Sequence, residues 1–326
     1  MRYRRGGALV SALFITAIAA MLATALAVQE RLLIHESELV VNADQGYLNL
    51  QLMQLIGKNA VKKYAEQWIG QKNLTAQFSP LEINLPPIKL NNTKLTATIS
   101  DEQGKFNIND LAYSENQNRF VVLLRTVMPA ISVEQALAIA KSITAWITTG
   151  ADDQYYLSLH PAYRSSQAEL SDVSELRLIK NITPKIYAVL KPYVTALHVK
   201  KPPSTPPKQY AAPTQVAIPV TPININSAEA PVLMTMNTKL TIEQARALES
   251  CRKQHGNFSQ LKDFISVCGS AAGITDLTAA STTSQYFSVD AQATMGKQVL
   301  TLSSLLVTQI EKNNTLDMVT VWQSFE

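Results

Sequence analysis

The chain has 326 residues, of which 46% are hydrophobic, and this is enough to form two or three domains with real cores. Its formal net charge of +4 falls to +1 without Arg2, Arg4 and Arg5 at the N-terminus. No other stretch carries the clustered lysines and arginines that neutralise several phosphates, so composition argues against a nucleic-acid partner.

The N-terminus predicts a membrane-spanning helix. After the three arginines, 23 residues from Gly7 to Gln29 carry no charge. As a helix they would span about 34 Å, which exceeds the roughly 30 Å of a hydrocarbon core. The leading arginines favour a cytoplasmic N-terminus with the rest of the chain exported. An uncleaved signal anchor and a signal peptide cleaved near Ala25–Ala27 are both alternatives.

The hydrophobic segment continues as an amphipathic pattern. Apolar residues recur at helical spacing, and no proline occurs before Pro80. This predicts one helix from about Gly7 to about Ile69, on the order of 90 Å long. A continuous helix favours a retained segment over a removable signal peptide. The periodic positions are Leu39, Ala43, Tyr47, Leu50, Met53, Val61, Tyr64 and Trp68.

The junction at Gly6 and Gly7 resembles the processing site of prepilins, which carry a short basic leader ending in glycine. The resemblance implies cleavage after Gly6 by a prepilin peptidase and methylation of Gly7. Most pilins have glutamate at the fifth mature position, where this chain has Ser11. A buried carboxylate needs a cationic partner, and a subunit at the tip of a fibre has no preceding subunit to provide one. A neutral residue at the fifth mature position resembles the pattern of the minor pseudopilin K family of type II secretion systems, which lacks this glutamate.

Later motifs resemble the same family in order and spacing. The turn from Asp101 leads into Phe106–Leu111, which resembles the family pattern F-N-x-N-x-L. Helices are predicted at 120–128 and 133–146, the second with a capping box of Ser132 and Gln135. The family's helical domain is then matched by Trp146-Ile147, Asp152-Asp153 before Tyr155-Tyr156, Pro161-Ala162-Tyr163-Arg164 and Ser174-Glu175-Leu176-Arg177-Leu178.

The second half divides into three parts. Seven prolines between 200 and 222 predict a linker or long surface loop. Residues 223–283 resemble a helix-hairpin-helix module, with helices at 228–236 and 241–254. Its hairpin, Met236–Leu240, lacks the glycine that would let backbone amides meet phosphate, so packing is its expected role. Strands are predicted at 83–90, 94–99, 286–294, 299–310 and 318–325.

These elements predict an α+β fold. A pilin-like long N-terminal helix would pack on a small antiparallel sheet, with a large, mostly α-helical domain inserted in the sheet. The predicted divisions are a leader (1–6), a transmembrane part (7–29), the pilin-like helix with the first strands (30–115), an inserted helical domain (116–199), the proline-rich linker (200–222), the helix-hairpin-helix-like unit (223–283) and the last strands (284–326).

Two features of the sequence predict a disulfide and a metal site. Cys251 and Cys268 would form a disulfide in an oxidising compartment, and two buried thiols are the alternative. Resemblance to the family implies a calcium loop at Asp152 and Asp153. Thr148, Thr149 and Gly150 stand where that loop usually has further aspartates, which implies weaker binding or none.

No catalytic motif was found, so an enzyme is not expected and no cofactor is required. The four histidines, His35, His160, His198 and His255, lie in unrelated contexts.

The resemblance implies a minor pseudopilin at the tip of a type II secretion pseudopilus. Its expected partners are the I and J type minor pseudopilins, contacted through the N-terminal helix and the pilin domain, and the prepilin peptidase. Its expected location is the bacterial inner membrane, single-pass, with the N-terminus cytoplasmic and the bulk periplasmic. The alternatives are a type IV pilus minor pilin for adhesion or DNA uptake, and a periplasmic enzyme on a signal anchor.

Overall fold

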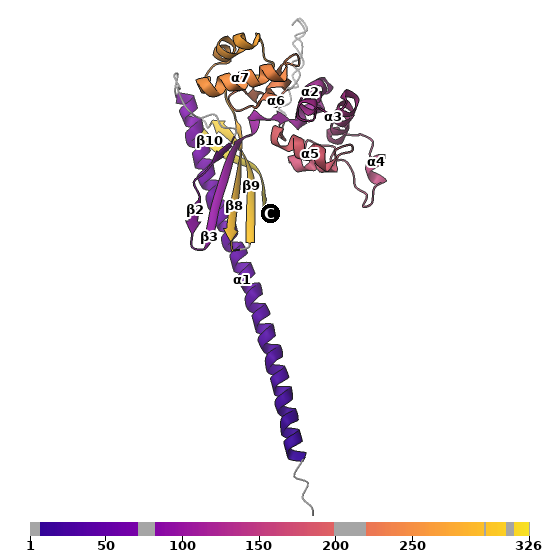
Figure 1. The fold of residues 1–326 in the computed structure, drawn as a ribbon, viewed down its shortest axis with the longest axis vertical. Helices are drawn as coiled ribbons and strands as arrows, with labels where there is room; N and C mark the ends of the chain where they lie inside the picture. Colours follow the sequence, from indigo (N-terminus) through magenta and orange to yellow (C-terminus); the bar gives the residue numbers. More distant parts are fainter. Residues whose placement is uncertain (1–6, 71–81, 199–219, 297, 311–315, 326) are drawn as a thin grey trace, which may run out of the picture.

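The structure is a computed structural model that describes residues 7–70, 82–198, 220–296, 298–310 and 316–325. The predicted leader and nearly all of the proline-rich segment lie outside these residues. A single long helix carries a sheet and a helical domain at one end (Figure 1).

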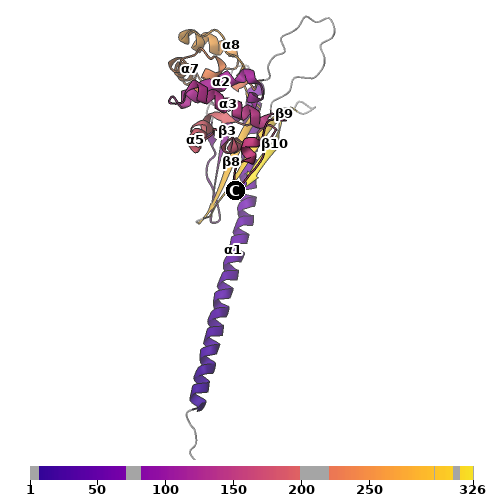
Figure 2. The same ribbon diagram turned by 90° about the vertical axis from the view of Figure 1, so that its right-hand side faces the viewer.

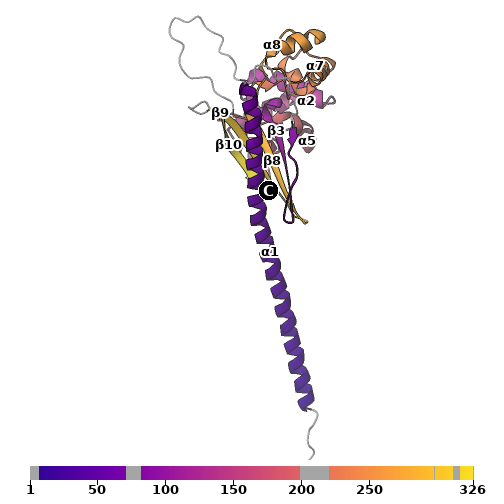
Figure 3. The same cartoon turned by 90° about the vertical axis from the view of Figure 1, so that its left-hand side faces the viewer.

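Helix α1 runs without interruption from Gly7 to Gly70, which confirms the predicted helix. Its first half extends away from the rest of the molecule, and its second half lies along the sheet (Figures 1 and 3). The residues that face the sheet and are buried are spaced three or four apart, as one face of a helix requires. They are Gly46, Leu50, Met53, Gly57 and Val61.

The sheet is antiparallel, with strand order β1-β3-β8-β9-β10 and β2 also paired to β3. Apolar residues on one face of β3, β8 and β9 pack against α1 in a compact core. The strands are β1 (Glu82–Asn84), β2 (Ile88–Leu90), β3 (Thr93–Asp101), β8 (Tyr286–Met295), β9 (Gln298–Ile310) and β10 (Leu316–Phe325).

Four of the five predicted strands are confirmed within a few residues, and one needs correction. The single strand expected over 83–90 is two short strands, β1 and β2. Pro86 and Pro87 separate them, because proline has no N–H to donate to a ladder.

The helical domain is inserted between β3 and β8, as expected, at the end of the sheet away from the free half of α1 (Figures 1 and 2). It contains its own apolar core. Its α-helices are α2 (Gln117–Val127), α3 (Val133–Ile147), α4 (Gln154–Leu157), α5 (Pro184–Leu190), α6 (Ala230–Leu233), α7 (Ile242–His255) and α8 (Leu261–Phe264).

This domain begins earlier than expected. Residue 116 was predicted as its start, but Phe106, Ile108 and Leu111 are fully buried in the helical core rather than the sheet core. The domain therefore begins directly after β3, at Glu102. No local pattern marks this start, because the F-N-I-N turn packs on residues 61 to 114 positions away.

Two helical units of the same plan make up the domain, residues 102–197 and 220–284. Each opens with a two-residue strand that pairs in parallel with a strand closing the unit. In both, an asparagine side chain donates to and accepts from the backbone of a distant loop residue: Asn109 holds Leu170, and Asn226 holds Phe258. The strands are β4 (Phe106–Asn107), β5 (Val194–Thr195), β6 (Ile223–Asn224) and β7 (Ala280–Ser281).

The sequences of the two units agree as well. Residues 131–136 read I-S-V-E-Q-A and residues 240–245 read L-T-I-E-Q-A. Ser132 with Gln135 and Thr241 with Gln244 form the same capping box at the starts of α3 and α7, which confirms the box predicted for the first unit. The shared plan indicates an internal duplication.

The close approach of α1 to the sheet yields a stability prediction. A Cβ at Gly57 would lie 2.7 Å from Cγ1 of Val289, a fully buried side chain with no flexible end to move aside. At Gly46 the obstructing atoms are the ends of the flexible Leu300 and Met295 side chains. We expect Gly57→Ala to lower the free energy of unfolding by about 1–2 kcal/mol, despite the better helix propensity of alanine.

Gly46→Ala is the matched control, expected to change the unfolding free energy by less than about 0.5 kcal/mol because propensity offsets the crowding. Urea unfolding of the full-length protein in detergent measures both. Equal losses at the two positions would contradict the assigned helix–sheet contact.

Candidate functional site: the exposed face of the N-terminal helix and the domain junction

The first half of α1 is apolar on all sides and fully exposed. Among the described residues, α1 is the one helix long and apolar enough to cross a membrane. A helix that is hydrophobic all round needs an apolar surrounding. The exposed apolar side chains of this half are Leu9, Val10, Leu13, Phe14, Ile15, Ile18, Met21, Leu22, Leu26 and Val28.

Beyond the uncharged segment, α1 exposes an apolar stripe, which we name the free stripe. Its residues are Ile34, Val41, Leu48 and Leu55. These residues are seven apart, and each is 53–63% exposed. Leu48 lies two residues from both Gly46 and Leu50, which turns it about 200° from the sheet-facing side. The stripe therefore faces away from the molecule's own sheet, with the spacing that packs helix against helix.

The predicted processing residues lie at the start of α1. Gly7 is the first residue of the helix, and Gly6 precedes the described part of the chain. Ser11 lies in the exposed apolar half, one turn further on. Cleavage, methylation and the role of Ser11 remain predictions.

The helical domain is joined to the sheet through the buried carboxylate of Asp101, the last residue of β3. Its Oδ2 accepts hydrogen bonds from Asn224 Nδ2 (2.9 Å), Ser227 Oγ (2.6 Å) and Ser284 Oγ (2.7 Å). Burial raises the pKa of Asp101, and these donors oppose the rise. One side chain thus ties the sheet to the second helical unit.

A second buried carboxylate, Asp110, joins the two helical units. It accepts from the backbone N–H of Thr221 (3.0 Å to Oδ2) and from the Thr221 hydroxyl (2.8 Å to Oδ1). Asn107 Nδ2 donates to the same hydroxyl (2.7 Å) and to the carbonyl of Leu197 (2.9 Å). Burial raises the pKa of Asp110 to about 6, opposed by Thr221 and by the charge of Arg119.

Sequence reasoning assigned no role to Asp101 or Asp110. The donors that join each aspartate to the second helical unit lie more than 100 positions away along the chain, so no local pattern reveals them. The available signal was the repeated asparagine pattern, F-N-I-N at 106–109 and I-N-I-N at 223–226.

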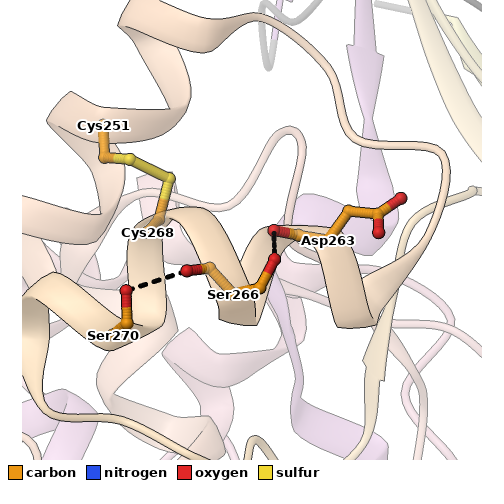
Figure 4. Close-up of a disulfide and its surroundings, with 5 residues drawn as sticks. All are labelled: Cys251, Asp263, Ser266, Cys268 and Ser270. Atoms are coloured by element: carbon orange, nitrogen blue, oxygen red, sulfur yellow. Dashed lines mark hydrogen bonds between the residues drawn. A yellow bond between two sulfur atoms is a disulfide. The ribbon is translucent and has the colours of Figure 1, made fainter.

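The structure pairs Cys251 on α7 with Cys268, at a Cα–Cα distance of 5.7 Å (Figure 4). Cys268 lies in the helical turn that follows α8, where Ser266 Oγ donates to the carbonyl of Asp263 and Ser270 Oγ donates to the carbonyl of Ser266 (Figure 4). The bond joins α7 to the turn after α8 within the second helical unit.

Asp152 and Asp153 lie side by side in the loop before α4, but their carboxylates do not converge. Asp152 Oδ1 accepts from the backbone N–H of Gln154 (2.9 Å), and Asp153 points inward to Ser165. The described residues contain no group of three or more His, Cys, Asp or Glu side chains placed to hold a metal ion. The calcium prediction therefore rests on these two residues alone.

Two models of one protein family match the chain. Both are described as type II secretion system (T2SS), protein K, one over residues 104–199 and the other over 223–290. Together they match half of the chain, and each coincides with one helical unit.

Curated relatives of the chain carry the same family name. Type II secretion system protein K of Pseudomonas aeruginosa is 25% identical, over 94% of this chain and 89% of its own length. The protein K of Aeromonas hydrophila is 30% identical over 32% of this chain and 38% of its own length.

A solved structure, the GspK-GspI-GspJ complex from the type 2 secretion system of enterotoxigenic Escherichia coli, contains a chain with the same fold. The TM-score is 0.63 at 18% identity, covering 89% of this chain and 99% of that one.

A long helix with an apolar free half, seated on an antiparallel sheet, defines a pilin-like subunit, and the α+β prediction is confirmed. The chain belongs to the type II secretion system protein K family and is a minor pseudopilin of that system.

The buried Asp110 gives a pH prediction. Between pH 4 and pH 6 the folded protein holds a proton on Asp110 that the unfolded chain, with a pKa of 3.8, has lost. Stability from this group is therefore complete below pH 3.8 and is lost as the pH rises through 6. Between pH 5 and pH 7 we expect the wild type to lose about 1 kcal/mol more stability than Asp110→Asn.

Urea unfolding of both proteins at the two pH values measures the difference. The contributions of groups that titrate equally in both proteins cancel when the two pH dependences are compared. Equal pH slopes would show that Asp110 is not buried as a carboxyl group at the junction.

Proposed function

We propose that this protein is the tip subunit of the type II secretion pseudopilus and assembles there with the I and J type minor pseudopilins to support export of folded proteins across the outer membrane. The observation that carries the proposal is α1, a single rigid helix with an apolar half for the membrane and a free stripe beyond it.

The free stripe favours a particular kind of partner. It begins at Ile34, only five residues beyond the uncharged segment, so a partner that covers it from that point also emerges from the membrane. The seven-residue spacing fits a second helix running alongside α1. Another pilin-like subunit has such a helix, which supports packing of parallel N-terminal helices.

The position of the helical domain supports a place at the tip. Three views show it at the end of the sheet furthest from the free half of α1, projecting sideways beyond the sheet (Figures 1, 2 and 3). In a fibre built from parallel helices, a domain of this size would occupy the space that the next subunit needs. Addition would stop at this end.

Processing and location follow from the same helix. Cleavage after Gly6 and methylation of Gly7 would leave α1 complete, because the helix begins at Gly7. The preceding arginines favour a cytoplasmic N-terminus in the inner membrane, with the sheet and the helical domain periplasmic. An oxidising periplasm suits the Cys251–Cys268 bond. In this role the protein assembles with its partners and catalyses no reaction.

Charging the free stripe tests the assembly surface. In Leu48→Glu, a carboxylate would be buried between helices without a cation, at a cost of several kcal/mol. We expect loss of protein export and of co-purification with the other minor pseudopilins, with little change in the Tm of the isolated protein. Val133→Glu is the matched control, since Val133 is 45% exposed but lies on α3.

Normal export by the Leu48→Glu variant, at normal protein levels, would show that the free stripe is not part of the assembly interface. Loss of export in both variants would point to general damage instead of a lost helix contact.

Replacing Gly6 tests the processing step. We expect Gly6→Leu to keep residues 1–6, because a bulky residue obstructs cleavage at the leader junction. Intact-mass spectrometry of the purified protein measures this, with a wild type that begins at a methylated Gly7 and an equally cleaved Ser11→Ala control. A wild-type protein that begins at Val28, or normal cleavage of the Gly6→Leu variant, would contradict the proposal.

A further inference from the structure

The first helical unit contains a segment that has no counterpart in the second unit. Residues 131–147 align with 240–256, and residues 170–176 align with 258–264. In the second unit, Asn257 alone joins these parts. In the first unit they are joined by residues 148–169, which we name the insertion. The second unit has the same plan without such a segment. The insertion must therefore be held against the first unit by contacts that the second unit does not have.

Those contacts begin at the end of α3. Tyr156 of the insertion packs edge-on against Trp146, with ring centroids 5.0 Å apart. The backbone N–H of Gln167 donates to the carbonyl of Trp146 (2.9 Å), and the Gln167 Oε1 accepts from the backbone N–H of Gly150 (3.1 Å). The two ends of the insertion are thereby held together.

Asp153 is at the centre of the insertion, with its side chain 6% exposed. Its Oδ1 accepts from the backbone N–H of Ser165 (3.0 Å) and from the Ser165 hydroxyl. Its Oδ2 lies 3.7 Å from the Arg164 guanidinium and 3.4 Å from the Gln167 amide nitrogen. These contacts hold the pKa of Asp153 below its usual range, led by the Ser165 hydroxyl.

This arrangement does not fit a calcium ion. Calcium takes six to eight oxygen ligands, whereas both oxygens of Asp153 face N–H and O–H donors. Asp152 is occupied at the start of α4. The loop between them and α3, residues 148–151, reads T-T-G-A and offers no carboxylate. The positive charge near Asp153 comes from Arg164, whose side chain is 72% exposed. The Ser165 donors therefore contribute more to holding Asp153 than the ion pair does.

We propose that Arg164 and Ser165 close the insertion on Asp153 in place of a divalent cation, so that the first helical unit folds independently of calcium. Asp153 is then a positioning residue: it fixes the insertion against α3. Arg164 and Ser165 are adjacent, so one turn carries both contacts to Asp153.

Thermal unfolding of the full-length protein in detergent, in excess EGTA or in millimolar calcium, tests the proposal. We expect the same Tm in both. A calcium site at about a hundredfold excess over its Kd would instead raise the Tm by several degrees. Such a rise, or one calcium ion retained per chain after dialysis and measured by atomic emission, would overturn the proposal.

Variants test the contact of Ser165 with Asp153. We expect Ser165→Ala and Asp153→Asn to lower the Tm by a few degrees, equally with EGTA and with calcium. Lys185→Met, at an exposed cation near the start of α5, is the control and should leave the Tm unchanged. Recovery of the Ser165→Ala variant by calcium would make Asp153 a metal ligand, and an unchanged Tm in both variants would show that Asp153 does not close the insertion. Both results would refute the proposal.

Discussion

The packing of the second half of α1 on the sheet is the contact on which the rest of the molecule depends. Glycines at 46 and 57 bring the helix close to β8 and the neighbouring β9, and Leu50 and Met53 fill the space between. Because one face of the helix is used in this way, the opposite face stays exposed, and the proposed assembly would use it. The same rigid helix continues into the apolar half. The sheet contact thereby fixes the sheet relative to the apolar half of the helix.

The helical domain is attached by a different kind of interaction. Asp101 and Asp110 are almost fully buried, and each is surrounded by donors from segments distant in sequence. Burying a carboxylate is costly, so such a junction is stable only when every donor is in place. An apolar junction would tolerate sliding. The polar one fixes the orientation of the domain on the sheet, which the proposed role at the tip of a fibre would require.

Much of the fold was predictable because its signals are local. The uncharged segment and helical spacing predict α1 within one residue of its end, and alternation predicts β3, β8, β9 and β10. The ladders β4–β5 and β6–β7 were missed, since two-residue strands carry no periodicity and their partners are distant. The buried roles of Asp101 and Asp110 were missed for the same reason. The duplication was visible in E-Q-A at 134–136 and 243–245.

The duplication also explains why one disulfide is present in a domain of two similar units. Cys251 aligns with Ser142 of the first unit, and Cys268 aligns with Lys180. The side-chain amide of Asn181, the residue after Lys180, donates to the Ser142 hydroxyl (3.0 Å), so the first unit joins the same two segments by a hydrogen bond. The first unit also has the insertion, whose aromatic rings cover Trp146. The second unit has the disulfide at the corresponding place, and a covalent link of this kind stabilises a fold mainly by restricting the unfolded chain.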